Sequence, residues 1–173
     1  MMNTIYYKSF ECLIGQLTVA WTPKGICRLL LPGDGLDSLD AWAAKHIKEY
    51  RLTAYCDQYE GITQLMQYFQ GKRHYFDCPL DIYGTEFSKK VWKIVSAVAY
   101  GTTATYKDVA VALGSPSACR AVGNANKRNP VPIIIPCHRI IGRDSTLTGY
   151  SGGIHLKRVL LDLEKLYTYN EIS

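Results

Sequence analysis

The chain contains no apolar run long enough to cross a membrane. Its two most apolar stretches, Ile26–Leu31 and Ile133–Ile135, are ended by Pro32 and Pro136, far short of the roughly 18 consecutive apolar residues that a membrane helix needs. The N-terminus also lacks the basic segment and apolar core of a secretory signal. The sequence therefore predicts a soluble, cytoplasmic protein with no membrane partner.

The cysteines and histidines also lack the spacing of a metal-binding site. The chain has 6 cysteines and 4 histidines, but they are scattered, without a CxxC pair or a paired zinc spacing. Without a secretory signal, reduced thiols are expected rather than disulfides. The sequence predicts no metal site, and it contains no internal repeats or low-complexity tracts.

Charge is present but unevenly distributed. The composition, with 47% hydrophobic and 20% charged residues among 173, is that of a globular chain. Residues 1–85 carry 8 Lys and Arg against 9 Asp and Glu, whereas residues 86–173 carry 12 against 6. A one-sided basic excess is typical of a nucleic-acid binder, although a solvated basic surface fits the charge alone equally well.

The first half has alternating strand and helix patterns. Three short runs rich in β-forming residues predict an antiparallel meander, and two apolar-periodic stretches predict helices. These are strands at Ile5–Phe10, Leu17–Trp21 and Ile26–Leu31, and helices at Asp37–Ile47 and Gly61–Gln70. Charge and composition shift near residues 80–86, which predicts an N-terminal domain of residues 1–82 and a C-terminal domain of residues 83–173.

The second half is predicted to be mainly helical. One apolar stripe begins at Thr85 and ends near Gly101, a short helix covers Thr105–Leu113, and Ser115-Pro116 opens another helix. Two short helices joined by a glycine-containing turn are typical of a helix-turn-helix. In its second helix only Arg120 is long, and small residues such as Ala121 and Gly123 let the backbone approach a narrow groove. This pattern favours docking over major-groove reading.

The segment Val131–Arg139 is the most distinctive in the chain. Two prolines bracket an apolar run that leads into Cys137, His138 and Arg139. Neighbouring cationic or imidazole groups lower the pKa of a thiol and make it reactive. Adjacent residues rarely point the same way, so a buried structural cysteine beside a surface cation remains the alternative at this point, and Arg139 is assigned no role.

Motifs in a fixed order extend from Thr85 to Glu164. They are Phe87–Trp92, Tyr100–Tyr106, Arg120–Gly123, Asn129–Pro132, Ile135–Arg139 and Gly149–Gly153, followed by a helix ending at Leu161–Glu164. In this order and spacing they resemble the O6-alkylguanine-DNA alkyltransferases, repair proteins that move an alkyl group from DNA to their own cysteine. The first 80 residues resemble this family only in their pattern of strands and helices.

The resemblance implies a fold and an activity. The fold is α/β, with a ribonuclease-H-like N-terminal antiparallel sheet with helices and a mainly helical C-terminal domain containing the helix-turn-helix. The activity is irreversible, single-turnover transfer from O6-alkylguanine, with O4-methylthymine as a second candidate substrate. The implied partner is double-stranded DNA with alkylated bases. No cofactor and no obligate protein partner are expected, and the protein is expected to be a monomer.

The resemblance also assigns catalytic roles. Cys137 matches the alkyl acceptor, and His138, oriented by Glu164, matches the base that draws the thiol proton through a water. Tyr106 matches a donor to the guanine O6 atom, and Asn129 matches a residue that keeps the active-site turn rigid. Without the family, Tyr106 would be assigned to packing.

Other positions match substrate and DNA contacts. Tyr150 and Ser151 match the loop over the extruded base, and the carbonyls near Cys137 and Ile140 would accept its exocyclic amine. Arg120 matches the residue that fills the gap left by the base, although a phosphate contact is the ordinary expectation for such an arginine. The DNA-binding positions are completed by phosphate contacts and by small residues on the helix: Lys127, Arg128, Ala121 and Gly123.

Two other functions remain open from the residues alone. A cysteine hydrolase would use a Cys–His pair to form a thioester that water releases. A helix-turn-helix regulator would bind DNA without chemistry.

Overall fold

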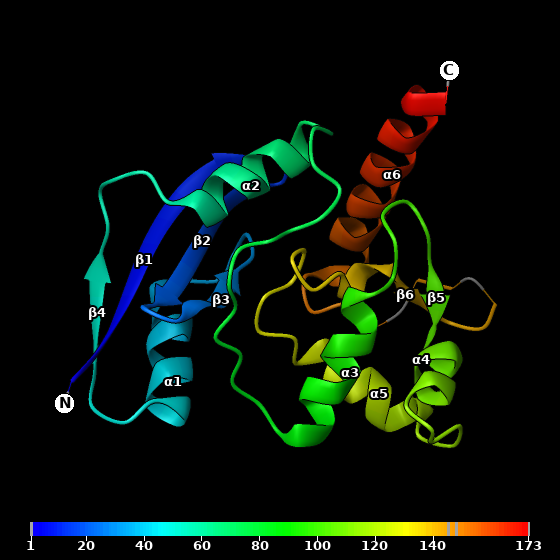
Figure 1. Ribbon diagram of the computed structural model, residues 1–173, viewed down its shortest axis with the longest axis horizontal. Helices are drawn as coiled ribbons and strands as arrows, with labels where there is room; N and C mark the ends of the chain where they lie inside the picture. The colour runs from blue at the N-terminus through cyan, green and yellow to red at the C-terminus, as the bar shows by residue number, and fades with distance from the viewer. Residues whose placement is uncertain (1, 145, 148, 173) are drawn as a thin grey trace. The chain divides into compact units, whose positions relative to one another are not determined.

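The computed structural model describes residues 2–144, 146, 147 and 149–172 (Figure 1). It divides into two compact units, Met1–Tyr83 and Gly84–Ser173, called here the N-terminal and C-terminal units. Within the described ranges, every helix is too short or too polar to cross a bilayer.

The N-terminal unit is built on a four-stranded sheet with strand order β3-β2-β1-β4. The predicted meander is present as three antiparallel strands, and the fourth strand pairs in parallel with the first. The strands are β1 (Asn3–Cys12), β2 (Gly15–Thr22), β3 (Gly25–Leu30) and β4 (Tyr50–Ala54). The sheet is therefore mixed rather than wholly antiparallel.

Strand β4 was not predicted from the sequence, and the connection before it explains its direction. Helix α1 (Leu36–His46) joins β3 to β4, and a strand that follows a helical crossover runs parallel to the strand before it. Tyr50 and Leu52, which alternate along β4, pack against the buried cluster under α1. A period-two pattern of β-forming residues was thus present in the sequence.

Each face of this sheet is covered by one helix, and most residues of β2 and β3 are buried. The face under α1 carries Ile5, Ala20 and Leu30. Strand β2 alternates, so Trp21 lies on the opposite face, where its ring stacks on that of Tyr59 at 3.8 Å between centroids. Tyr59 is the N-cap of α2 (Glu60–Phe69), which covers this second face.

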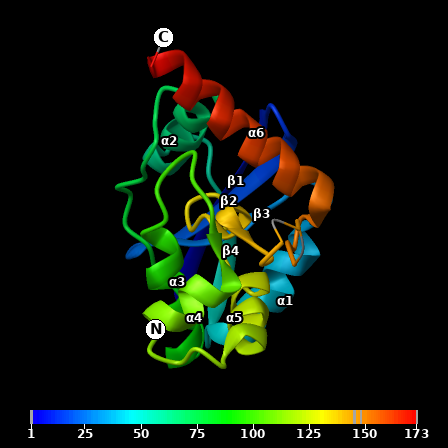
Figure 2. The ribbon, with the colours of Figure 1, turned by 90° about the vertical axis from the view of Figure 1, so that its right-hand side faces the viewer.

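The C-terminal unit is mainly helical, and the predicted fold class is confirmed. Its only described sheet is a parallel pair of two-residue strands, separate from the four-stranded sheet. Figure 2 shows its long last helix. The elements are α3 (Glu86–Ser96), β5 (Ala104–Thr105), α4 (Tyr106–Ala112), α5 (Cys119–Lys127), the 3-10 turn η1 (Cys137–Arg139), β6 (Ile140–Ile141) and α6 (Gly153–Ile172).

The predicted helix-turn-helix is present as α4 and α5, but α5 begins later in the chain than expected. Thr105 caps α4 through a capping box with Asp108, and Gly114 adopts a φ of +75° after the helix. Helix α5 begins at Cys119 rather than at Pro116. The Pro116 carbonyl accepts the Lys107 ammonium at 2.9 Å instead of starting a helical ladder.

Two other helix ends also differ from expectation. Helix α3 ends at Ser96, before the expected Gly101, because the Ala97 and Val98 amides bond to carbonyls three residues back. Helix α6 continues past Glu164 to Ile172.

A glycine contact in the N-terminal unit supports a stability prediction. Gly25 has a φ of +146°, and a Cβ added there would overlap the Pro79 carbonyl. We expect Gly25→Ala to lower the free energy of unfolding by roughly 2–4 kcal/mol, through steric overlap and backbone strain. Urea denaturation measures this change. Gly33→Ala is the matched control, because Gly33 has a φ of +93° but no atom near its added Cβ. Equal losses in the two variants would contradict the steric argument.

Candidate active site

Cys137 is buried at the start of η1, and its side chain is held by Asn129. The residue is 1% exposed, and the Asn129 Nδ2 atom donates to its Sγ atom at 3.0 Å. Burial raises the pKa of the Cys137 thiol to about 11, although the Asn129 bond and the positive charge of Lys157 act in the opposite direction. The resting thiol is therefore protonated at neutral pH, and its reaction with an electrophile needs a base.

Asn129 also fixes the turn that leads to the thiol. Its Nδ2 atom donates to the Ile135 carbonyl at 2.8 Å, and its Oδ1 atom accepts the Val131 amide at 3.0 Å. Within this turn Ile133 is fully buried with a φ of +73°, a conformation that a β-branched residue adopts only under constraint. The Asn129 side chain thus supplies bonds that hold a strained turn in place.

Asn126 connects the second helix of the helix-turn-helix to the same turn. It lies on the buried side of α5, and its Nδ2 atom donates to the Cys137 carbonyl at 3.1 Å. The outer face of the same helix carries Arg120 and Lys127, both exposed. One helix therefore touches the thiol segment on one side and solvent on the other.

His138 and Glu164 form a fully buried pair. The His138 Nε2 atom lies 2.7 Å from the Glu164 Oε1 atom, and both side chains are 0% exposed. Burial alone would raise the pKa of Glu164, but its bonds with His138 and Arg139 lower it to about 2. The ionised carboxylate can only accept, so Nε2 carries the hydrogen.

The other ring nitrogen of His138 is consequently unprotonated. Burial lowers the pKa of His138 below its usual value, against the opposing effect of Glu164. Its Nδ1 atom is buried and has no hydrogen-bond partner among the described residues. The arrangement therefore presents a neutral imidazole with a free acceptor in the residue next to the thiol.

Arg139 balances the buried carboxylate, a role that the sequence analysis did not assign. Its Nε and Nη2 atoms each donate to Glu164 at 2.9 Å, and its Nη1 atom donates to the Val98 carbonyl at 2.6 Å. The Gly101 amide adds a further bond to Glu164 at 3.0 Å. Glu164 thus joins α6, η1 and the segment that follows α3.

Lys157 is a second buried cation that the sequence analysis missed. Its Nζ atom donates to the Ile140 carbonyl at 2.5 Å and lies 6.0 Å from the centre of the Tyr106 ring. Burial lowers the pKa of Lys157 to about 8. Its signal in the sequence is its spacing, since it stands seven residues before Glu164 on the buried stripe of α6.

The predicted substrate-side residues lie around this centre. The Tyr150 ring meets the His138 ring edge-on at 6.4 Å between centroids. Tyr106 lies next to Gly149, where an added Cβ would be 2.6 Å from the tyrosine hydroxyl, and next to Gly123, where it would be 3.8 Å from the ring. The structure therefore brings Tyr106, Tyr150, the loop that contains Gly149, and helix α5 together around η1.

The remaining predicted positions differ in exposure. Ile140 is buried, and its carbonyl, expected to accept the base amine, already accepts Lys157. Ser151 is exposed in the turn before α6. The predicted DNA contacts are exposed except for half-buried Gly123; the exposed ones are Arg120, Ala121, Lys127 and Arg128.

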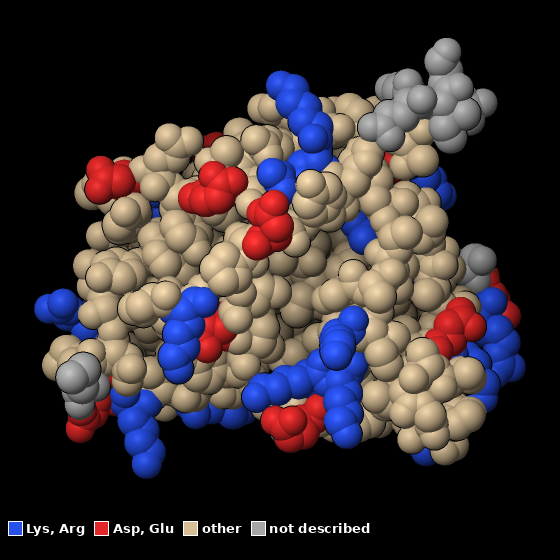
Figure 3. Space-filling view, viewed as in Figure 1, with Lys and Arg blue, Asp and Glu red and all other residues tan. Residues whose placement is uncertain are grey.

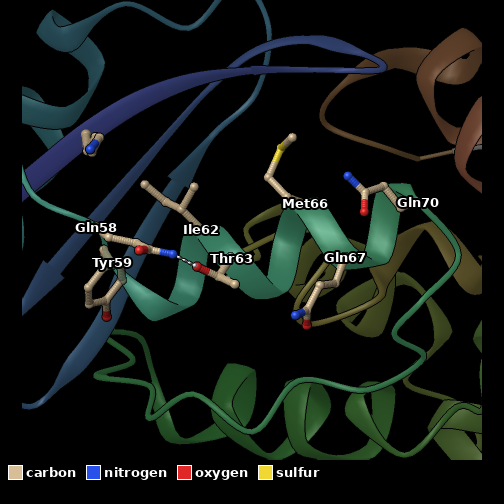
Figure 4. Close-up of a pocket in the computed structure, with 8 residues that line it drawn as sticks. Gln58, Tyr59, Ile62, Thr63, Met66, Gln67 and Gln70 are labelled. Carbon is tan, nitrogen blue, oxygen red and sulfur yellow. Dashed lines mark hydrogen bonds between the residues drawn. The ribbon is translucent and has the colours of Figure 1, made fainter.

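Among the described residues, no group of three His, Cys, Asp or Glu side chains could hold a metal. A hollow of about 450 Å³ runs along α2 in the N-terminal unit (Figure 4). Its lining includes Lys8, Gln58 and Met66 but no carboxylate, thiol or imidazole. The Lys8 ammonium donates hydrogen bonds to the carbonyls of Cys56 and Asp57, each at 2.8 Å.

Known proteins resemble this chain along nearly its whole length. A methylated-DNA–protein-cysteine methyltransferase of Methanosarcina barkeri is 44% identical over 162 residues, which cover 93% of this chain and 98% of that protein. The crystal structure of Mycobacterium tuberculosis O6-methylguanine methyltransferase superposes with a TM-score of 0.82 at 38% identity, covering 94% of each chain. Mycobacterium tuberculosis OGT in complex with DNA gives a TM-score of 0.81, with the same identity and coverage.

Two family models also match. Residues 5–82 match the ribonuclease-like domain of 6-O-methylguanine DNA methyltransferase, and residues 86–166 match its DNA-binding domain. With both domain models matched in order and a relative similar over almost the full chain, this protein belongs to the 6-O-methylguanine DNA methyltransferase family.

Proposed function

We propose that this protein repairs O6-alkylguanine in duplex DNA by transferring the alkyl group to Cys137. The observation that carries the proposal is the buried thiol beside a neutral histidine whose other nitrogen is bound to an ionised glutamate. Family membership supplies the activity, and this geometry supplies an acceptor and a base. The C-terminal unit performs both DNA contact and chemistry, and the protein acts as a monomer on alkylated duplex DNA.

The thiol attacks the alkyl carbon as its proton leaves. A water relays the proton from the Cys137 Sγ atom to the His138 Nδ1 atom, which is the unpartnered nitrogen of the pair. Glu164 stabilises the imidazolium that forms and keeps the ring in the required tautomer. The sulfur–carbon bond forms while the bond from carbon to guanine O6 breaks, so no oxidant or cofactor enters the balance.

The leaving group takes negative charge onto the purine, and donors near O6 lower the barrier. The Tyr106 hydroxyl and the Ser151 amide act as these donors. The purine anion stays in the DNA strand and becomes guanine by taking up a proton, which balances the proton that left the thiol. Tyr150 covers the base from the side of the His138 ring. The product is a thioether, which has no carbonyl for water to attack, so Cys137 is consumed once.

Reaching a buried thiol requires the base to leave the duplex, which costs a few kcal/mol. The small residues of α5 allow a close approach to the groove, while Arg120 fills the space of the extruded nucleotide and Lys127 and Arg128 contact phosphates. The exposure of these three side chains on and beside α5 supports this arrangement.

The proposal differs from both alternatives in a measurable way. A cysteine hydrolase turns over repeatedly, and a helix-turn-helix regulator needs no thiol. Because the thioether is a dead end, protein treated with excess methylated duplex should gain one methyl group, on the peptide that contains Cys137. Mass spectrometry detects this addition, and Cys137→Ser should retain DNA affinity but acquire none.

Cys119→Ser is the matched control for that experiment, because Cys119 lies on α5 but is held by the Pro116 carbonyl rather than by the active-site turn. It should react like the unchanged protein. Methyl on another cysteine, or steady release of product beyond one equivalent, would reject the proposal.

Removing the charge of Glu164 should lower stability in a pH-dependent way. Glu164→Gln leaves Arg139 buried without its counterion, so we expect roughly 3–5 kcal/mol less stability at pH 7. The folded pKa lies below the ordinary value of 4.5, so this contribution is present above pH 4.5 and is lost as the pH falls towards about 2. Methyl transfer should also slow by about 10²-fold or more.

Urea denaturation at several pH values measures the stability change. Asp162→Asn, an exposed neighbour on α6, is the control and should change little. A loss in Glu164→Gln that is equally large at pH 7 and pH 2 would contradict the assignment of charge.

Arg120→Ala should separate base extrusion from simple docking. We expect repair of duplex DNA to slow by one to two orders of magnitude, equivalent to a few kcal/mol of unstacking. Attack on the free base O6-benzylguanine should slow far less, because no base has to be extruded. Single-turnover rates on the two substrates measure the difference.

Lys127→Ala is the control, since it stands seven residues along the same exposed face. It should weaken binding to all duplexes alike and lower the salt slope by about 1. Equal slowing of Arg120→Ala on duplex and free base would overturn the role given to Arg120.

A further inference from the structure

We infer that the DNA-contact surface extends beyond the helix-turn-helix onto α3, where Lys89, Lys90 and Lys93 bind phosphates of the same duplex. This inference rests on the proposed function, because it takes duplex DNA as the partner. It adds an interaction surface on an element outside α4 and α5.

The outer face of α3 is strongly basic. Lys89, Lys90 and Lys93 are all exposed, and the single acidic residue of the helix is Glu86. Glu86 lies 3.4 Å from the Lys89 ammonium, but both side chains are exposed, so the pair contributes little and can exchange for a phosphate. Figure 3 shows blue side chains gathered over α3.

The contacts of Trp92 show which side of α3 faces α5. The buried face of α3 carries Val91, Trp92 and Val95, and the Trp92 Nε1 atom donates to the Ala125 carbonyl of α5 at 2.9 Å. Residues three and four apart are neighbours on a helix surface. Lys89 stands three residues before Trp92 and four residues before Lys93, so Lys89 neighbours the Trp92 contact and Lys93 continues the same row along the helix.

The facing end of α5 is also basic. Arg128 follows Ala125 by three residues at the C-cap, and Lys127 ends the helix; both side chains are exposed. Arg128 stands three residues after Ala125, and Lys89 three residues before Trp92, so each of these cations neighbours one partner of the contact between the two helices.

The composition of α5 explains why such an extension is needed. The helix runs Cys-Arg-Ala-Val-Gly-Asn-Ala-Asn-Lys, with two long cationic side chains. If Arg120 fills the space of an extruded base, Lys127 alone remains on α5 to neutralise phosphates, together with Arg128 after it. Affinity for duplex DNA without a lesion depends on phosphate neutralisation, so further cations must flank this helix.

Three other cations of the unit already have partners within it, and the remaining ones outside α3 and α5, Arg143, Arg158 and Lys165, are exposed on α6 or before it. Arg139 is paired with Glu164, Lys157 donates to the Ile140 carbonyl, and Lys107 donates to the Pro116 carbonyl. The lysines of α3 are exposed, and their one acidic neighbour is itself exposed. They fit a regularly spaced polyanion passing beside α5 better than a single small anion.

The test is the salt dependence of binding to an undamaged duplex, which isolates docking from chemistry. The triple variant Lys89→Gln, Lys90→Gln, Lys93→Gln should lower the slope of log affinity against log salt by about 2–3, since each phosphate contact adds about 0.9. Replacing the same three lysines by arginine keeps the charge and should keep the slope. Each single Lys→Gln variant should lower it by about 0.9.

A second triple variant, Lys45→Gln, Lys48→Gln, Lys72→Gln, removes the same charge from exposed positions of the N-terminal unit. It should leave the slope unchanged. If it lowers the slope as much as the α3 variant, net charge rather than a surface is responsible and the inference is wrong. An unchanged slope in the α3 variants also overturns it, and the single variants decide the matter if the triple variant unfolds early in a thermal melt.

Failure of the inference is distinguishable from failure of the proposed function. Methylation of the Cys137 peptide by methylated duplex is measured on the unchanged protein. If that peptide is methylated while the α3 variants keep the full salt slope, the proposed function stands and the inference falls. If the peptide stays unmodified while the α3 variants lose slope, the proposed function falls and the inference stands.

Discussion

The buried carboxylate of Glu164 is the interaction on which the C-terminal unit depends. Moving an ionised carboxylate out of water is costly unless charge and hydrogen bonds replace its hydration. Here Arg139 supplies the opposite charge, and His138 and the Gly101 amide supply further bonds. Because these partners come from η1 and from the segment after α3, one residue of α6 fixes segments that are far apart in the sequence.

The same carboxylate determines the protonation states around the thiol. It forces the His138 hydrogen onto Nε2 and leaves Nδ1 as an acceptor, while burial keeps the ring neutral. Burial likewise raises the pKa of Cys137 to about 11. A protonated, 1% exposed thiol is a poor target for alkylating agents in solution. We conclude that its reactivity depends on a substrate that enters the site and on the adjacent base, which suits a residue that is used once.

The sequence predicted elements with a strong local pattern and missed those whose reason lies elsewhere in the chain. The apolar stripe of α3 and the short helix α4 before a glycine turn are local patterns, and both helices were predicted. Strand β4 is short, and its direction follows from the crossover through α1 rather than from its own residues. The motif identified Cys137, His138 and Glu164 by resemblance, but Arg139 was assigned no role because its partner stands 25 residues away.

The roles of the buried cations and asparagines could not be predicted from the sequence either, for a physical reason. A basic residue is ordinarily exposed, so neither Arg139 nor Lys157 is expected inside from composition. Asn126 differs from an ordinary surface asparagine only through its position on the inner side of α5. In each case the side chain is defined by an acceptor that folding brings to it: a carboxylate, or the carbonyls of Ile140 and Cys137.

In the proposed function, helix α5 joins docking on DNA to the chemistry at the thiol. Its inner side donates from Asn126 to the Cys137 carbonyl, and Asn129, two residues beyond the helix, donates to the thiol itself. Its outer side carries Arg120 and Lys127 on a surface of small residues. A shift of this helix against a duplex would therefore move the hydrogen bonds that hold Cys137, the alkyl acceptor. Under the proposed function, charge for docking is better supplied by a neighbouring element than by more long side chains on α5, which would hold the backbone away from the groove.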